Sequence, residues 1–424
     1  MKKIIFILGM LLANQLCLAA ISLPAIFSDH MVLQRNQEVP VWGWADPGEK
    51  ISLHFHQQAM QTVANAKGEW MIRLKPETAG GPYSLIVEGS NKIAFQDVLV
   101  GDVWFCSGQS NMEWDMVRTE GYDLEMQQAN FPPIRQIKIQ KAVNTLPQQQ
   151  LVPTTWKITD TNTLKEVSGV AYYFAKKMQA AQQVPIGIIN DSWGGTNIET
   201  WIPREAFEAS PYFSNMIKKS PRMQGDSFRN YLHEQQTKQI EKQLKAHIAD
   251  FNESDFLRDA YNEANAADIN CPKGWEAQGY DLDGIGWYRK TVILSEADLQ
   301  SDAHIFLGMI DDDDITYING VKVGETHQYD AHRIYTIPKA LLKAGKNVIV
   351  VRVTDTGGGG GLWGEDDLKL ETSGRKISLN GSWKFYVSEI FKSFRENDFP
   401  SLVYNGMVAP LVPYAISGFL WYQG

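Results

Sequence analysis

The chain has 424 residues, of which 44% are hydrophobic and 21% are charged. This composition is typical of a folded globular protein, and the length predicts about two to four domains. The net charge is -9, from 40 basic and 49 acidic residues, and no lysine- or arginine-rich run stands out. We therefore expect no nucleic-acid partner, since that binding depends on basic groups that neutralise phosphates.

The N-terminus has the pattern of a secretory signal peptide. Residues 1–3 are basic at two positions, residues 4–12 are apolar, and Ala19 and Ala20 are small residues suited to cleavage. The apolar run is too short to cross a bilayer, and no other stretch is long enough, so we expect no membrane attachment. Removal of residues 1–20 predicts a secreted or periplasmic protein.

Cys106 and Cys271 remain after the predicted cleavage. Two cysteines so far apart give little support for a disulfide, and they are too few for a structural zinc site. We therefore expect both thiols to be free.

Residues 21–97 predict an N-terminal β-sandwich. Residues 39–44, 51–56 and 81–87 alternate apolar and polar side chains, as half-buried strands do. The Asp-Pro-Gly sequence at 46–48 marks a turn between two of them.

Residues 98–205 have the pattern of an α/β unit. Residues 98–106 and 184–190 are apolar runs typical of buried strands, and residues 170–181 have the spacing of an amphipathic helix. Strand, helix and strand in this order predict a parallel sheet.

The remaining chain divides into three parts. Residues 206–262 are polar and helix-forming, and we interpret them as a helical linker. Residues 263–390 return to strand patterns with an Asn-Gly hairpin turn at 319–320, which predicts a second β-sandwich. Residues 391–424 end in another apolar strand, so the second sandwich is interpreted as an insertion in the α/β domain.

Two other segments could suggest a ligand site but are better interpreted as a turn and a loop. Asp311–Asp314 lacks the glycine and the trailing glutamate of an EF-hand, and it is predicted to be a solvated turn. Gly357–Gly361 has no following Gly-Lys-Ser/Thr, so it is predicted to be a flexible loop and not a phosphate site.

The segment Ser107–Trp114, with the sequence Ser-Gly-Gln-Ser-Asn-Met-Glu-Trp, follows a predicted strand directly. A serine on a tight turn at a strand end is exposed, and the N–H groups that follow can face a developing oxyanion. Met112 stands where the α/β-hydrolase elbow requires glycine, so this is a different motif. Ser110 is the candidate nucleophile.

Three segments together resemble the sialate O-acetylesterase family of SGNH-type carbohydrate esterases. They are residues 101–114, residues 191–201 (Asp-Ser-Trp-Gly-Gly-Thr-Asn-Ile-Glu-Thr-Trp) and residues 404–424. The resemblance runs from Leu23 to the end of the chain. It implies an α/β fold: an incomplete SGNH-hydrolase-like (flavodoxin-like) three-layer domain, with the N-terminal β-sandwich and an inserted galactose-binding-like jelly-roll.

The resemblance also implies an activity and a site. The expected activity is removal of O-acetyl groups from sugars through an acyl-enzyme on Ser110, with an acetylated carbohydrate as partner and no metal or organic cofactor. The oxyanion hole would use the N–H of Ser110 and that of Gly194 or Gly195, and the sequence does not choose between these glycines. The polar residues expected to contact the substrate are Gln109, Asn111, Glu199 and Gln423.

The family's general base is a histidine with an aspartate shortly before it, both after the third segment. Neither occurs in this chain, which is therefore expected to be truncated at its C-terminus. Among the eight histidines, His332 has an acid two residues before it, at Asp330, and a surface turn is the better interpretation; His30, which follows Asp29, is likewise interpreted as structural. We assign no base. Three alternatives stay open: a non-catalytic carbohydrate-binding protein, a gene fragment, and an esterase acting on plant-polymer acetyl groups.

Overall fold

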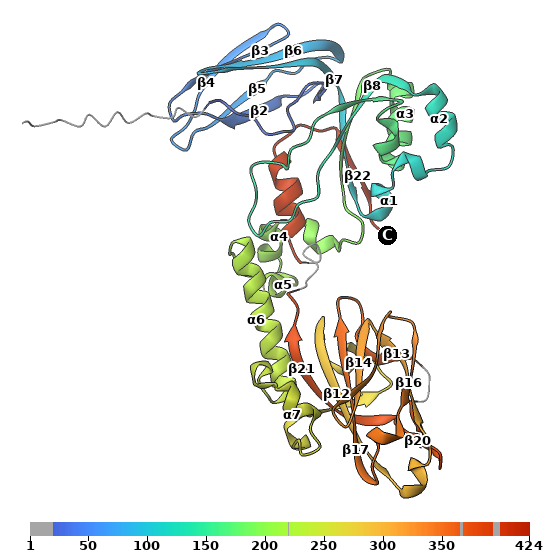
Figure 1. The fold of residues 1–424 in the computed structure, drawn as a ribbon. Helices are drawn as coiled ribbons and strands as arrows, with labels where there is room; N and C mark the ends of the chain where they lie inside the picture. The colour runs from blue at the N-terminus through green and yellow to red at the C-terminus, as the bar shows by residue number, and fades with distance from the viewer. Residues whose placement is uncertain (1–19, 219, 365–367, 393–398) are drawn as a thin grey trace, which may run out of the picture. The chain divides into compact units, whose positions relative to one another are not determined.

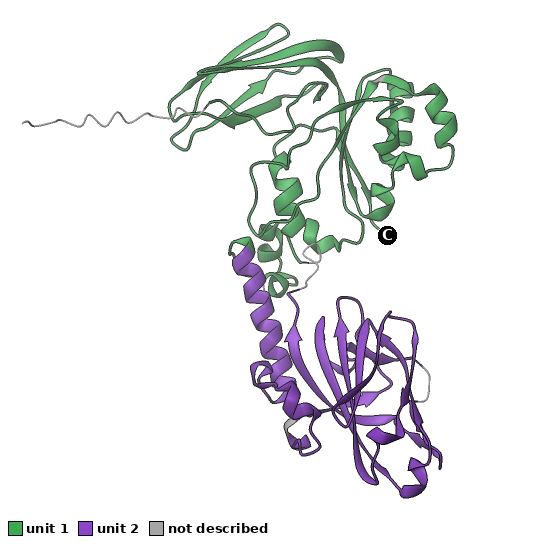
Figure 2. Ribbon diagram, in the orientation of Figure 1, with its two compact units in different colours: residues 1–225, 395–424 green, residues 226–394 purple. Residues whose placement is uncertain are grey.

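The computed structural model describes residues 20–424, except 219, 365–367 and 393–398. It divides into two compact units, shown in Figure 2: unit 1 comprises Met1–Gly225 and Arg395–Gly424, and unit 2 comprises Asp226–Phe394. Apart from Ala20, the predicted signal peptide lies outside the described residues.

Within this described part, no helix combines the length and the apolar character that a bilayer crossing requires.

Strand β7 (Lys92–Gly108) runs through both halves of the main sheet of unit 1 (Figure 1). Its first half pairs with β6 (Gly80–Glu88) in the antiparallel sense, and its second half pairs in parallel with β10 (Ile186–Ser192) and β22 (Gly418–Tyr422). The predicted boundary between residues 97 and 98 thus falls inside one continuous strand. One apolar core spans both halves, because Leu53 and Phe105 belong to the same buried cluster. The N-terminal β layer is therefore part of unit 1 and not a separate compact unit.

The other strands of unit 1 complete this sheet, except β2 (Val39–Trp44) and β5 (Glu69–Leu74), which pair with each other as a separate two-stranded sheet. The strands that complete it are β1 (Val32–Gln34), β3 (Lys50–Phe55), β4 (Gln58–Val63), β8 (Asn130–Lys138) and β9 (Lys157–Asp160). The helices of unit 1 are α1 (Ser110–Glu113), α2 (Tyr122–Gln128), α3 (Gly169–Gln182), α4 (Arg204–Ala209) and α5 (Ser214–Lys218). The parallel part has the order β22-β7-β10-β8.

Helix α3 is the helix that the sequence pattern predicts. Ser168 caps its N-terminus, since the Ser168 hydroxyl accepts a hydrogen bond from the Ala171 N–H. Ala171 and Ala175 are fully buried in one apolar cluster with Ile188 of β10. This packing covers one face of the parallel sheet and supports the carboxyl ends of β7 and β10.

Unit 2 consists of two sheets and a helical segment. One sheet has the order β11-β21-β12-β17-β14-β15, and the other has the order β16-β13-β19-β20 with β18 beside β13. The strands are β11 (Ala267–Cys271), β12 (Gly284–Leu294), β13 (Ala303–Asp311), β14 (Asp313–Ile318), β15 (Val321–His327), β16 (His332–Ile337), β17 (Gly345–Asp355), β18 (Gly361–Trp363), β19 (Lys369–Glu371), β20 (Lys376–Ser378) and β21 (Gly381–Ile390). The helices are α6 (Gly225–Leu244) and α7 (Glu253–Leu257).

The interpretation of residues 206–262 as a linker is wrong for most of this range. Ile240 and Leu244 of α6 are buried in the main core of unit 2, and Phe256 of α7 is buried in a second cluster. Arg289, itself 0% exposed, donates hydrogen bonds to the carbonyls of Phe256 and Arg258. The polar composition hid these few apolar anchors, because most of α6 faces solvent.

The interpretation of Asp311–Asp314 as a solvated turn is also wrong. These residues join β13 to β14, and Asp314 is 1% exposed. The Asp314 carboxylate accepts hydrogen bonds from Arg333 (3.0 Å), Tyr335 (2.8 Å) and Thr316 (2.9 Å). A run of four acids does not reveal that one of them is paired with a buried arginine.

Candidate functional site

Three strand ends converge at one edge of unit 1. Strand β7 leads to Ser110, β10 leads to Gly194, and β22 leads to Gln423. The three strands are parallel and adjacent, with β7 in the middle, so their carboxyl ends lie at the same edge (Figure 1). Open α/β sheets bind their ligands at this kind of edge.

Gly108 brings the neighbouring strands close to the nucleophile turn. Its φ is +131°, and a Cβ added there would lie 2.0 Å from the Tyr422 carbonyl oxygen. The Gln109 N–H donates to that same carbonyl at 3.0 Å, and the Trp193 N–H donates to the Gly108 carbonyl at 3.0 Å. Only glycine fits between two strand ends that approach so closely.

Ser110 is the first residue of α1 and is exposed to solvent. A methyl group added to Gly194 would lie 3.2 Å from the Ser110 Cβ, so the second segment contacts the predicted nucleophile. Gly195 has a φ of +77°, and open space surrounds the position that its Cβ would take. The structure therefore places Ser110, Gly194 and Gly195 together.

Glu113 is a site residue that the sequence analysis missed. Its carboxylate accepts a hydrogen bond from the Gly194 N–H at 2.6 Å and forms an ion pair with Lys141 at 2.5 Å. The Gly194 N–H is thus occupied by a carboxylate oxygen, whereas no described residue accepts a hydrogen bond from the Gly195 N–H. Glu113 lies within the nucleophile motif, but nothing in the sequence indicates which backbone group it holds.

Two of the predicted substrate-binding side chains join the three segments instead. The Asn111 amide donates to the Gly424 carbonyl at 2.8 Å, and the Gln423 amide donates to the Thr196 carbonyl at 2.9 Å. Gln109 caps α1 through its backbone carbonyl, which accepts from the Met112 and Glu113 N–H groups. These contacts hold the turn, the second segment and the third segment in one arrangement.

Glu199, the fourth predicted substrate-binding residue, lies on the 3₁₀ turn Ile198–Trp201. Its carbonyl accepts a hydrogen bond from the Ser401 N–H at 3.1 Å. Among the described residues, no hydrogen bond or ion pair joins its carboxylate to the residues around Ser110.

A cleft of about 400 Å³ opens beside the nucleophile turn. Its lining includes Asn111 and three aromatic side chains that are partly or largely exposed, namely Trp114, Tyr173 and Tyr422. The Arg118 guanidinium stacks on the Trp114 ring at 4.4 Å from its centre. The volume of the cleft is within the range of small-molecule sites, and its aromatic walls with a few polar groups suit a sugar-sized ligand.

Asp191 lies in β10 directly opposite Ser107 in the strand register. It is 0% exposed, and neither carboxylate oxygen has a hydrogen-bond partner among the described residues. Burial raises the pKa of Asp191 to about 8, so the carboxyl group is held largely neutral at pH 7. A neutral carboxyl group beneath the nucleophile strand is a feature that the sequence analysis did not single out.

No histidine of the described chain forms a hydrogen bond with Ser110. His30 pairs with Asp97 at 2.7 Å, and Arg135 holds the same carboxylate. His332, considered as a substitute base, begins β16 in unit 2. Cys106 and Cys271 are free and buried, as expected.

The strand-end serine and the two adjacent glycines lie together at one edge of the parallel sheet, and the comparisons with known proteins concern this same region. Residues 100–265 match the family described as carbohydrate esterase, sialic acid-specific acetylesterase. The chain is 31% identical over 204 residues to a sialate O-acetylesterase of Pongo abelii, covering 43% of this chain and 39% of that relative. It therefore spans about two fifths of the length of this curated relative.

Two further matches are to proteins that are named as acting on carbohydrates. A solved carbohydrate acetylesterase from Xanthomonas citri is 38% identical, with 45% of this chain and 44% of that chain covered and a TM-score of 0.44. A putative beta-glucuronidase of Formosa agariphila is 33% identical over 113 residues, covering 23% of this chain and 11% of that protein.

The family match over residues 100–265 and the likeness to the Pongo abelii sialate O-acetylesterase confirm the resemblance to this family that the sequence motifs predict. They support the predicted class, a carboxylic ester hydrolase.

Proposed function

We propose that unit 1 is an esterase domain that removes O-acetyl groups from sugars, with Ser110 as its nucleophile. The observation that carries the proposal is the placement of an exposed serine at the carboxyl end of β7, in contact with Gly194 at the end of β10. The expected acetylated carbohydrate partner follows from the family resemblance.

In the proposed reaction, the Ser110 Oγ attacks the acetyl carbonyl carbon, and the serine proton passes to a base. The N–H groups of Ser110 and of Gly194 or Gly195 stabilise the oxyanion. Collapse of this intermediate breaks the ester C–O bond, releases the sugar hydroxyl and leaves acetyl on Ser110; water then releases acetate. The Gly195 N–H is available as the structure stands, whereas the Gly194 N–H becomes available only if Glu113 moves.

The substrate class follows from the cleft beside Asn111. Arg118 is half exposed, stacks on Trp114 of the cleft wall and lies 3.7 Å from the Asp115 carboxylate; we propose that it pairs instead with the carboxylate of an anionic sugar such as sialic acid. We propose an O-acetylated sialic acid as the substrate, and a neutral acetylated plant polysaccharide is the alternative. Arg118→Gln is expected to raise KM about tenfold for acetylated sialic acid, the cost of one lost charged contact, and to leave KM for acetylated xylan unchanged. The reverse pattern would favour the plant polymer.

A second candidate is a non-catalytic carbohydrate-binding protein. It is favoured by one observation, namely that no described histidine is hydrogen-bonded to Ser110. The resemblance implies a histidine base after the third segment, and we propose that turnover depends on it.

The test is hydrolysis of 4-nitrophenyl acetate by this chain, by a longer chain that adds a histidine-containing segment after Gly424, and by the Ser110→Ala variant of each. We expect turnover in the longer chain that Ser110→Ala lowers about a thousandfold or more. Turnover that does not depend on Ser110 would overturn the assignment. Binding of an acetylated sugar without turnover in the longer chain would favour the non-catalytic candidate.

The resemblance also supports finer proposals about architecture and location. We propose that the β layer before residue 98 is an N-terminal β-sandwich fused to the SGNH-like sheet, and that unit 2 is a galactose-binding-like jelly-roll. We further propose that residues 1–20 direct export to the periplasm or the medium. No metal or organic cofactor is part of this proposal.

A further inference from the structure

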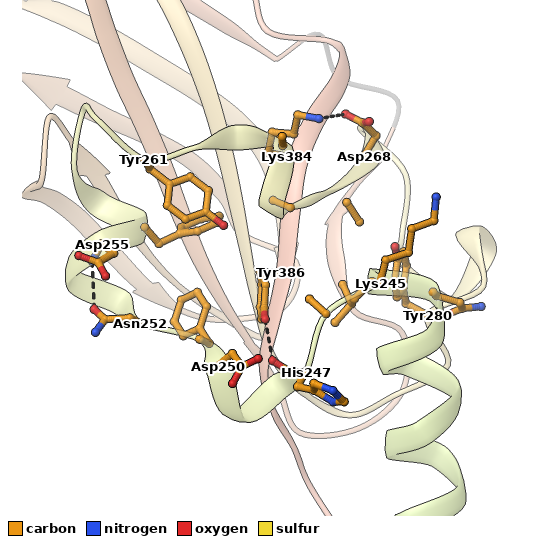
Figure 3. A pocket seen from close by; sticks show the side chains of 18 residues that line it. Lys245, His247, Asp250, Asn252, Asp255, Tyr261, Asp268, Tyr280, Lys384 and Tyr386 are labelled. Carbon is orange, nitrogen blue, oxygen red and sulfur yellow. Dashed lines mark hydrogen bonds and ion pairs between the residues drawn. The ribbon is translucent and has the colours of Figure 1, made fainter.

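Unit 2 contains a cavity that the proposed esterase chemistry does not use. Its volume is about 810 Å³, which is in the range of ligand sites. The cavity lies between the chain that follows α6, helix α7, and strands β11 and β21, as Figure 3 shows. Every lining residue belongs to unit 2, so this unit alone forms the site.

Aromatic rings form one side of the cavity, and their packing fixes them in place. Phe251 packs against Trp287 with ring centres 5.1 Å apart and against Tyr386 at 5.2 Å. Tyr261 packs on Phe256 at 4.9 Å, and the Arg289 guanidinium stacks on the Tyr261 ring. Rigid flat apolar surfaces of this kind can bind the C–H face of a ring without a further cost of ordering.

Polar side chains surround the aromatic wall, as Figure 3 shows. The Asp250 carboxylate, near the Tyr386 hydroxyl, forms no hydrogen bond or ion pair with the rest of the described chain. The Asn252 Oδ1 accepts from the Asp255 N–H, which leaves the amide NH₂ group without a partner among the described residues. Lys384 lies across the cavity, paired with Asp268 at 2.9 Å. Asp250 therefore supplies free acceptors and Asn252 a free donor.

The charges of the lining largely cancel. Asp268 pairs with Lys384, and Asp255 pairs with Arg258. The other acidic and lysine side chains of the lining are Asp250 and Lys245, so an anionic ligand meets no net positive charge here. The described residues contain no cluster of side chains suited to a metal ion. An uncharged molecule with apolar ring faces and many hydroxyl groups fits both the aromatic and the polar sides.

We infer that this cavity is a binding site for a neutral oligosaccharide, distinct from the esterase site on Ser110. One or more sugar rings stack on Phe251 and Tyr261, and sugar hydroxyls donate to Asp250 and accept from Asn252. The site would hold a carbohydrate chain by its unmodified sugars, so it needs no acetyl group and no catalysis.

The test is isothermal titration of the Ser110→Ala full chain with xylobiose, lactose and cellotriose, and with N-acetylneuraminic acid as the anionic comparison. Because Ser110→Ala removes the nucleophile, the result does not depend on the proposed esterase function. We expect at least one neutral sugar to bind with a Kd of about 1 mM or tighter, the range of a small ligand in an open site. Asp250→Asn and Tyr261→Ala should each weaken binding about tenfold or more.

Tyr329→Ala is the matched control, since Tyr329 is a largely exposed tyrosine of unit 2 outside the cavity lining. It should leave the Kd unchanged. Asp250 is exposed, so Asp250→Asn tests the site even if Tyr261→Ala proves unstable in thermal melting. The inference is overturned if no neutral sugar binds, if Asp250→Asn leaves the Kd unchanged, or if N-acetylneuraminic acid binds as tightly as the best neutral sugar.

Discussion

Two buried aspartates, Asp314 in unit 2 and Asp191 in unit 1, show two different ways in which this protein buries a carboxyl group. Asp314 in unit 2 is 1% exposed, and Arg333, Tyr335 and Thr316 all donate to it. Asp191 in unit 1 is 0% exposed and has no partner among the described residues. Burial raises the pKa of both groups. Asp314 nevertheless has three donors to stabilise its charge, one of which is a cation, whereas the neutral acid is the favoured form of Asp191 at pH 7.

The paired Asp314 lies far along the chain from the candidate site, whereas the unpaired Asp191 lies in the strand next to the one that leads to Ser110. Buried polar groups in native structures are normally satisfied, and exceptions call for a specific explanation. The exception here lies one strand from Ser110, in register with Ser107, whose buried hydroxyl also lacks a partner among the described residues. We conclude that the paired Asp314 serves the stability of unit 2, and that the unsatisfied Asp191 and Ser107 lie where the candidate chemistry of unit 1 lies.

The largest expected effect on stability comes from breaking the buried ion pair between Arg333 and Asp314. Arg333→Ala leaves the Asp314 carboxylate buried without its cation, and it should lower the free energy of unfolding of unit 2 by about 3–5 kcal/mol. Chemical denaturation with hydrogen exchange resolved by unit measures this. Arg375→Ala is the control, because Arg375 is about half exposed although it also pairs with a buried aspartate, Asp298. An equal loss in both variants would contradict the role of burial.

The next effect is on unit 1, at Gly108. Gly108→Ala places a methyl group 2.0 Å from the Tyr422 carbonyl oxygen at a φ of +131°, so β22 must move away. We expect a loss of about 3 kcal/mol in the stability of unit 1. Gly195→Ala is the matched control, with a positive φ but open space around it, and should cost about 1 kcal/mol. Similar losses in both variants would show that strand contact at Gly108 is not the cause.

Asp191 should make the stability of unit 1 depend on pH. Its folded pKa of about 8 lies above the unfolded value near 3.8, so the folded state retains a proton that the unfolded state loses. The free energy of unfolding should therefore fall as pH rises from 4 to 8. Asp191→Asn should flatten this dependence and recover part of the loss at pH 8, because the amide cannot ionise. Denaturation curves at several pH values measure it, and an unchanged slope in the variant would contradict the assignment.

The smallest expected effect concerns Glu113. Glu113→Ala releases the Gly194 N–H and the ion pair with Lys141, so the turn at Gly194 and Gly195 loses its hold beside Ser110. We expect kcat/KM to fall about tenfold in an active form of the esterase, because the oxyanion donors are less well positioned. Stability should change little. A rise in kcat/KM would instead mean that Glu113 blocks Gly194 as the donor.

Much of the candidate site could be predicted from the sequence because its features are local. A strand period followed by Ser-Gly-Gln-Ser predicts an exposed serine, and the Gly-Gly pair predicts a tight turn. The helix over residues 170–181 follows from its amphipathic spacing, and α3 spans Gly169–Gln182. These signals depend on residues within one turn or one strand of each other.

Tertiary structure alone decided which distant groups meet. The sequence does not reveal that Glu113 holds Gly194, that Gln423 holds Thr196, or that Asp191 lacks a partner, since each depends on strands separated by tens or hundreds of residues. The polar composition of residues 206–262 predicted a helical linker, whereas Ile240 and Leu244 of α6 pack in the core of unit 2. Periodicity and turn residues report local backbone preference, whereas burial and pairing depend on how the whole chain closes around each side chain.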